Sequence, residues 1–200
     1  MYRALREWIL ISDFRSGSLL TERELARRLE VSKTPVREAL IRLGQEGFVE
    51  ISPRRGIRVS SVSVQDLKEV FGIRSALEGL AAETAAGCIP RHVLVELRRQ
   101  FRQAARAKDD ERLFELGARL HDLTIEACGN RRLASIVDTI RAQIARYSRL
   151  ASRLPEQARQ SLRDHLRILR ALERRDPVGA RRAVEQHIRD VKENLVRSML

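Results

Sequence analysis

Three of the four histidines, His121, His165 and His187, could bind one metal ion together. Each falls in a different segment with helical periodicity, on the apolar face of that segment. A single histidine on such a face is usually a core residue with its ring nitrogens satisfied, because a buried imidazole needs hydrogen-bond partners. Three converging imidazoles can instead coordinate a divalent ion, and zinc or nickel fits these donors best. Both interpretations stay open, and we take the metal site as the hypothesis.

An arginine within an apolar stripe is the second group that could bind a ligand. Arg74 must be paired or face a polar cavity, because an unpaired buried guanidinium is costly. It could form an ion pair with Glu78, four residues later on the same helix, or hold a ligand carboxylate in a bidentate fork. Tyr147 and Arg146 could line the same pocket. A metal with an open position beside Arg74 favours a small carboxylate as the effector.

Basic and hydroxyl side chains gather at the start of a third helix, where they could read DNA. Lys33, Thr34 and Arg37 share a face that the apolar stripe of this helix leaves free. Lysine and arginine donate to guanine O6 and N7 in the major groove, and hydroxyl groups such as that of Ser32 reach phosphates. A solvated basic helix face is the ordinary alternative for each residue taken singly.

Other candidate contacts to the same duplex lie before and after this helix. Arg23 begins the preceding helix, and Arg55 and Gly56 lie in the turn between two short strands. A glycine there lets the backbone approach a groove without a Cβ in the way. We therefore predict a DNA-binding surface, whose members are Arg23, Ser32, Lys33, Thr34, Arg37, Arg55 and Gly56.

The elements that must position these residues follow a winged helix-turn-helix order. An amphipathic helix is expected at 3–12, and Thr21 three residues before Glu24 predicts the N-terminus of the next helix. The third helix runs over 33–45, and short strands at 48–51 and 57–59 form the wing.

Long helices follow a linker at 60–65, and no further strand is indicated. They are expected near 66–86, 91–107, 109–128, 131–152, 156–174 and 177–198. The fold class is therefore mainly α, with a winged helix-turn-helix domain at 1–62 and an all-helical antiparallel bundle of about six helices at 63–200.

Composition points to a polyanionic partner and to the cytoplasm. The 200 residues carry a net charge of +12, and the basic residues are spread along the chain. We find no secretion signal and no apolar run of membrane-spanning length, so we expect a cytoplasmic protein with no membrane partner. Only 4% of the residues are aromatic, which favours an aliphatic core of packed helices.

Two segments carry a resemblance to a known family. Residues 20–59, with TPVREAL at 34–40, resemble the winged helix-turn-helix of GntR-family regulators. DLKEVFGIRSALEGLAAETAA at 66–86 is similar to the start of the FCD effector domain of the FadR subfamily. Lys33 replaces the usual arginine, and Glu30 replaces the usual glycine before the turn.

The resemblance implies a regulator, a repressor in the first instance, that binds near-palindromic operator DNA as a homodimer and responds to an effector in its C-terminal domain. It places Arg74 near the ligand cavity. It also implies an Asp-His-His-His metal site, to which His121, His165 and His187 correspond, but Gly117 stands where the family has the aspartate. The chain therefore lacks one anionic ligand of the family site.

Two other functions remain as alternatives. The metal itself could be the signal, in a direct metal-sensing regulator. A helical-bundle metalloenzyme is the less favoured alternative, since an open metal site alone resembles catalytic zinc but no general base or nucleophile motif accompanies it. We predict that the chain is not an enzyme.

Overall fold

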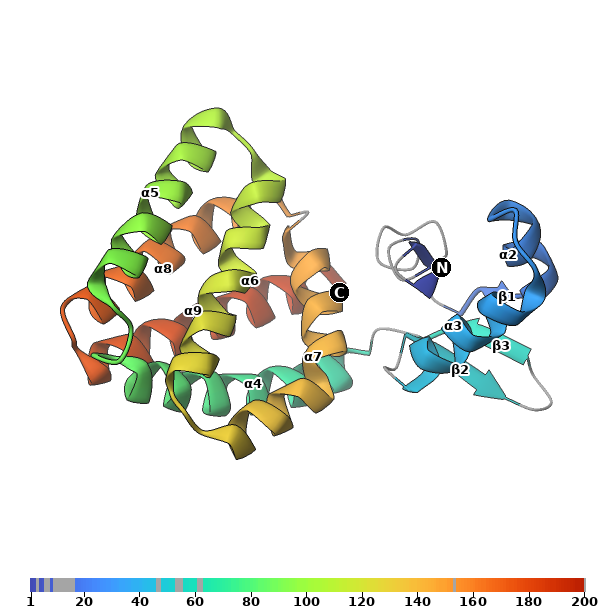
Figure 1. The fold of residues 1–200 in the computed structure, drawn as a ribbon, viewed down its shortest axis with the longest axis horizontal. Helices are drawn as coiled ribbons and strands as arrows, with labels where there is room; N and C mark the ends of the chain where they lie inside the picture. The colour runs from blue at the N-terminus through green and yellow to red at the C-terminus, as the bar shows by residue number, and fades with distance from the viewer. Residues whose placement is uncertain are drawn as a thin grey trace.

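The computed structural model describes residues 1, 2, 4, 5, 8, 17–45, 48–52, 56–60, 63–152 and 154–199. Within these residues the chain is mainly helical with one small sheet, which confirms the predicted fold class. Figure 1 shows two lobes. We call the lobe formed by β1–β3, α2 and α3 the head, and the lobe formed by α4–α9 the bundle.

The head has the predicted winged helix-turn-helix elements and one additional strand. Its order along the chain is β1 (Leu19–Leu20), α2 (Glu22–Arg28), α3 (Lys33–Gln45), β2 (Val49–Ser52) and β3 (Gly56–Val59). The sheet is antiparallel in the order β1-β3-β2, and Ile51 pairs with Ile57 across the wing. Thr21 caps α2 as predicted, since its hydroxyl accepts a hydrogen bond from the Glu24 N–H at 3.2 Å.

The turn between α2 and α3 contains a left-handed residue. Glu30, for which the resemblance implied a glycine, adopts φ 54°. A side chain is less favourable than glycine in this conformation, by roughly 1 kcal/mol. The turn is nevertheless closed by backbone hydrogen bonds, of which Val31 N–H to the Ala26 carbonyl measures 3.0 Å.

A small aliphatic core fixes the orientation of α3. The predicted inward stripe of this helix is buried and packs with α2 and the sheet; it consists of Val36, Ala39, Leu40 and Leu43. The opposite face of α3 is therefore left on the surface. Leu5 is buried in the same core and Trp8 packs against it, while most of the predicted helix 3–12 lies outside the described residues.

The bundle consists of helices whose ends agree closely with the prediction. They are α4 (Val64–Ala85), α5 (Arg91–Ala107), α6 (Asp110–Ala127), α7 (Arg131–Ser152), α8 (Pro155–Glu173) and α9 (Pro177–Met199). Ser63 and Asp109 cap α4 and α6 through their side chains. Helix α4 packs against α6, α7 and α9 and runs along one edge of the lobe (Figure 1).

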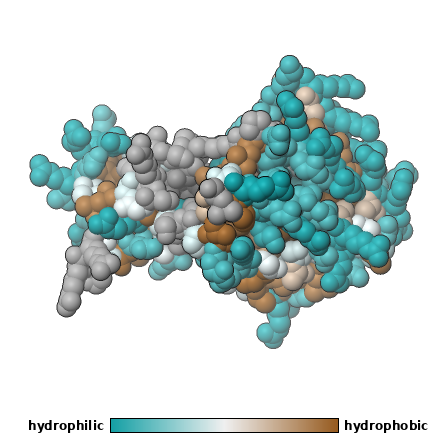
Figure 2. All heavy atoms as spheres, turned by 180° about the vertical axis from the view of Figure 1, so that it is seen from behind, coloured by the Kyte–Doolittle hydropathy of each residue, from teal (hydrophilic) through white to brown (hydrophobic). Residues whose placement is uncertain are grey.

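The surface of the bundle is largely polar. Figure 2, which views the molecule from behind, shows hydrophilic side chains over most of this lobe. None of the helices in the described part of the chain has the length and hydropathy required to cross a membrane.

Ser60 joins the two lobes. Its N–H donates to the Phe48 carbonyl in the head at 3.0 Å, and its carbonyl accepts from Arg146 Nη2 in α7 at 2.6 Å. Helix α4 begins four residues later, at Val64. The domain boundary at 62/63 stays a prediction.

Candidate metal centre and nucleic-acid interface

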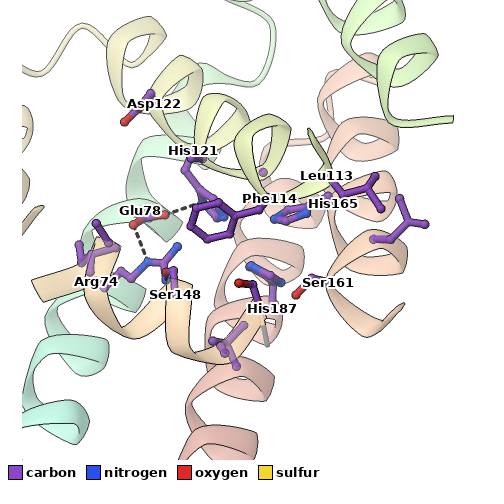
Figure 3. A pocket seen from close by; sticks show the side chains of 18 of the residues that line it. Arg74, Glu78, Leu113, Phe114, His121, Asp122, Ser148, Ser161, His165 and His187 are labelled. Atoms are coloured by element: carbon purple, nitrogen blue, oxygen red, sulfur yellow. Dashed lines mark hydrogen bonds and ion pairs between the residues drawn. The ribbon is translucent and has the colours of Figure 1, made fainter. Parts of the chain in front are cut away.

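The three predicted histidines meet in the interior of the bundle (Figure 3). His121 comes from α6, His165 from α8 and His187 from α9, and each side chain is buried. One nitrogen from each ring lies within 4.8 Å of the other two. Metal–nitrogen bonds of roughly 2.1 Å place two tetrahedral ligand nitrogens about 3.4 Å apart, so the rings would have to move closer together for all three to bind one ion.

The chemistry of this cluster fits a divalent metal. His121 Nε2 and His165 Nε2 are buried and have no hydrogen-bond partner in the described part of the chain. Burial, followed by the charges of the neighbouring histidines, holds the pKa of His165 well below its usual value. Burial likewise lowers the pKa of His187 to about 4. The His165 and His187 rings are therefore neutral near pH 7, and neutral imidazole is the form that coordinates metals.

A buried ion pair lies against the cluster. Arg74 Nε donates to Glu78 Oε1 at 2.8 Å, and Arg74 Nη1 donates to Ser148 Oγ of α7 at 3.2 Å. The other carboxylate oxygen, Glu78 Oε2, lies 2.6 Å from His121 Nδ1. Burial raises the pKa of Glu78, but the Arg74 and His121 charges outweigh that effect and hold it below its usual value. The ion pair between Arg74 and Glu78 was one of the two interpretations of Arg74. The contact between Glu78 and His121 was not predicted.

A second buried carboxylate faces another histidine. Asp164 is fully buried, and its Oδ2 lies 3.6 Å from His187 Nδ1. Sequence reasoning missed Asp164 as well, although its position directly before His165 was a signal that could have been used.

The cluster forms one end of a cavity of about 300 Å³. Arg74 lines the cavity too, so it is both paired with Glu78 and accessible to a ligand. Most other walls are apolar side chains, among them Phe101, Phe114 and Leu162. A cavity with a few converging polar groups at one end of an apolar chamber is typical of a small-molecule site.

Gly117 is in direct contact with the cluster. A Cβ added to this residue would lie 2.5 Å from His165 Cε1, which is closer than real Cβ atoms approach other heavy atoms. The His165 ring therefore uses space that any side chain at 117 would need. Glycine at 117, where the resemblance implied an aspartate, therefore allows this position of His165.

Tyr147 lies elsewhere, which corrects its predicted role at the effector. It is buried and absent from the described walls of the cavity. Its hydroxyl donates to Asp66 near the start of α4, and its ring packs edge-on against Phe71. The tyrosine thus joins α7 to α4 through Asp66 and Phe71, outside the described walls of the cavity.

The described candidates for DNA contact lie on the surface of the head. Ser32, Lys33, Thr34 and Arg37 are exposed on and before the first turn of α3, and Arg23 is exposed on α2. Gly56 is exposed at the start of β3 with φ 77°, a conformation that glycine adopts readily. Arg55 lies outside the described residues.

One contact in this surface was not predicted. Glu22 of α2 accepts two hydrogen bonds from Arg37, at 2.8 Å from Nε and 2.9 Å from Nη2. Arg37 still has 66% of its side chain exposed. The bidentate pair therefore restrains the direction of the guanidinium without burying it.

We predict that Gly117→Ala lowers the free energy of unfolding of the metal-free protein. The new methyl group overlaps the buried His165 ring, and such overpacking costs ~1–3 kcal/mol, which outweighs the higher helix propensity of alanine. Gly72→Ala in α4 is the matched control, because open space surrounds that position, and it should gain up to ~1 kcal/mol. Urea unfolding measures both; equal effects of the two substitutions would contradict the observed contact.

Family models match both lobes. Residues 1–59 match the model described as bacterial regulatory proteins, gntR family, and residues 69–190 match the FCD domain. The HTH-type transcriptional repressor RspR of Escherichia coli (strain K12) is 30% identical over 198 residues, which cover 98% of this chain and 87% of RspR.

Solved structures with the same fold include E. coli McbR/YncC, with a TM-score of 0.78 at 22% identity over 100% of this chain and 96% of that one. The metal-free FCD domain of TM0439 gives a TM-score of 0.59 at 22% identity, covering 70% of this chain and 98% of that domain. The predicted family is thus confirmed, and the curated relatives are named as regulators of transcription, not as enzymes. The chain belongs to the GntR family of bacterial transcription regulators and carries a C-terminal FCD domain.

Proposed function

We propose that this regulator is a repressor whose DNA affinity is controlled by a small organic acid bound at a metal ion in the bundle. The observation that carries the proposal is the cluster of three buried histidines at the end of a cavity that Arg74 also lines. The name of RspR, a repressor, supports the direction of control.

The first turn of α3 enters the major groove of the operator in this proposal. Lys33 and Arg37 donate to base edges, while Arg23, Ser32 and Thr34 contact phosphates. Their exposure and the buried opposite face of α3 support this assignment. The wing, with Arg55 and Gly56, follows the adjacent backbone.

We predict that Lys33→Ala and Arg37→Ala each weaken specific operator binding by ~1–3 kcal/mol, or about 5- to 150-fold, if both residues read bases. Affinity is measured by fluorescence anisotropy on an operator selected from genomic fragments, at one fixed salt concentration. Arg102→Ala, which removes an exposed arginine from α5, is the charge-matched control and should leave affinity nearly unchanged. Wild-type operator affinity in both variants would show that neither Lys33 nor Arg37 contacts bases.

A divalent metal, zinc or nickel, would be held by His121, His165 and His187. When bound, it supplies positive charge and an open coordination position to an anionic ligand. Arg74 donates from Nε to Glu78 and from Nη1 to Ser148. Because the residue also lines the cavity, its remaining N–H groups can donate to a ligand carboxylate. The ligand that fits these groups and the small apolar chamber is an organic acid.

We predict that metal-loaded protein binds a small carboxylate in isothermal calorimetry, and that metal-stripped protein binds it at least tenfold more weakly. The amide of the same acid is the matched neutral ligand and should bind more weakly, because it lacks the charge that the metal and Arg74 recognise. Arg74→Met should lose most of this discrimination. If only the amides, and none of the acids, in a panel of such pairs bind, the proposed effector class is refuted.

A homodimer would present two heads to a near-palindromic operator, since a two-fold protein matches a two-fold site. An exposed apolar stripe on α4 supports association through the bundle. Ile73 and Leu80 lie seven residues apart on one face of α4, and they are 46% and 42% exposed.

Because it acts on operator DNA, the protein works in the cytoplasm.

Helix α7 supplies a physical route from the cavity to the head. Ser148 contacts Arg74 at the cavity, and Arg146, two residues earlier, holds the Ser60 carbonyl. The Ser60 N–H in turn bonds to Phe48, whose own N–H donates to the Leu43 carbonyl near the end of α3. A ligand that moves α7 by repositioning Arg74 would therefore shift α3, and a coupling of ~1–3 kcal/mol would change operator occupancy several-fold or more.

We predict that Arg146→Met uncouples the two sites. The variant should bind the acid with wild-type affinity but release the operator little when the acid is added, because the contact between α7 and Ser60 is lost. Arg132→Met, in the exposed first turn of α7, is the control and should respond as wild type does. Anisotropy titrations with and without the acid measure the response; a full response in Arg146→Met would exclude this route.

A direct metal sensor is the second candidate, and one observation favours it. The three nitrogens come from α6, α8 and α9, so an ion alone would cross-link three helices. Operator binding that changes with metal in the absence of any acid would select this function over the first.

A further inference from the structure

We propose that Glu78 is a positioning residue for the metal site: its fixed carboxylate orients His121 and supplies the negative charge that Gly117 does not. This inference rests on the proposed metal binding by the three histidines. It concerns which residue of this chain takes over part of the role of the missing aspartate.

The first step is the orientation of the His121 ring. Glu78 Oε2 lies 2.6 Å from Nδ1, and an ionised carboxylate only accepts hydrogen bonds, so Nδ1 carries the proton. In the neutral form of the ring, which is the form that binds metals, the lone pair is then on Nε2, the nitrogen left buried without a partner in the described residues (Figure 3). A carboxylate behind a ligating histidine fixes the ring tautomer and makes the ring a better ligand.

The second step is the rigidity of the carboxylate. Arg74 Nε binds Glu78 Oε1 at 2.8 Å, and Ser148 accepts a further hydrogen bond from Arg74. Glu78 is only 2% exposed and Arg74 only 4%, so water competes little with these contacts. The two residues lie one turn apart on α4, which makes the carboxylate a fixed charge rather than a mobile one.

The third step is the charge around the ion. Three neutral imidazoles supply no negative charge to a divalent cation, whereas the family aspartate supplies one. The space beside Gly117 is taken by His165, because an added Cβ would lie 2.5 Å from that ring. Any negative charge at the ion must therefore come from a bound anionic ligand or from another residue of the chain. Within the described residues, Glu78 is the buried carboxylate at hydrogen-bond distance from one of the three histidines.

Asp164 repeats the arrangement less closely. It faces His187 Nδ1, but the separation of 3.6 Å is longer than a hydrogen bond. Asp164 also accepts from Gln160 and Arg167, so its charge is shared with its own helix. Glu78 is therefore expected to contribute more to metal affinity than Asp164.

The test measures cobalt(II) binding to the full chain after metal has been stripped with a chelator. Affinity comes from competition with a chromophoric chelator, and geometry from the visible absorption of the bound ion. Glu78→Gln keeps the size of the side chain and removes its charge, and should weaken cobalt binding by about 10- to 100-fold and change the spectrum. Glu83→Gln, which removes a partly exposed carboxylate of α4 paired with Arg181, is the control and should match wild type.

A second pair of variants separates positioning from simple neutralisation of Arg74. If Glu78 only balances the Arg74 charge, then Arg74→Met and Arg74→Met/Glu78→Gln will bind cobalt equally well. If Glu78 positions His121, the double variant will still bind about 10- to 100-fold more weakly than Arg74→Met. The double variant buries no unpaired charge, so it can also be compared directly with wild type where Glu78→Gln or Arg74→Met alone fails to fold: cobalt binding about 10- to 100-fold weaker than wild type supports positioning, and wild-type affinity contradicts it.

The outcomes distinguish this inference from the function on which it rests. Wild-type protein that binds no cobalt overturns both the metal site and the role of Glu78. Wild-type protein that binds cobalt, with equal affinity in Arg74→Met and its double variant, overturns the role of Glu78 alone. Weaker binding on loss of Glu78 in the Arg74→Met background, with Glu83→Gln unaffected, supports the inference.

Discussion

The burial of an arginine–glutamate pair against three histidines is the interaction around which the candidate site of the bundle is built. Around it the core is aliphatic, and such a core gives polar groups no solvation. The pair is stable because each charge has a fixed partner, and His121 is held because Glu78 has a second oxygen to offer. One nitrogen of each histidine, His121 Nε2, His165 Nε2 and His187 Nδ1, has no hydrogen-bond partner among the described residues, and an ion could satisfy them.

Helix α4 connects this chemistry to the rest of the molecule. It carries Arg74 and Glu78 in its middle, follows Ser60 at its start, and packs against α6, α7 and α9. Helix α7 then contacts the same region twice, through Ser148 at the cavity and through Arg146 at the joint with the head. The polar cluster is therefore in contact with two helices that both reach the joint between the lobes, and the proposed coupling would pass through them.

Local patterns predicted much of the fold and the identities of the candidate ligands. Helical periodicity with Pro, Gly and Asp breaks located the six bundle helices closely, and the buried stripe of α3 was predicted in full. The three histidines were chosen because each lies on an apolar face, and their convergence follows from packing those faces together. The TPVREAL segment, by resemblance, indicated the family that the comparisons confirm.

What the sequence did not predict depends on contacts between elements. Glu78 was interpreted only as the partner of Arg74, because the i, i+4 spacing is visible along one helix while its distance to His121 on α6 is not. The Glu22–Arg37 pair spans two helices for the same reason. Tyr147 was assigned to the cavity, but it contacts Asp66 of α4 instead. Helical periodicity shows that a side chain is buried, not which neighbouring element it faces. The two-residue strand β1 is too short for a period-2 pattern.

The most direct test of this account is anomalous diffraction from crystals of the full chain soaked in zinc or cobalt. The account predicts one anomalous peak, about 2.0–2.2 Å from a nitrogen of each of His121, His165 and His187. A structure from such crystals with no anomalous peak there, and with the three rings hydrogen-bonded to ordered water, would contradict it.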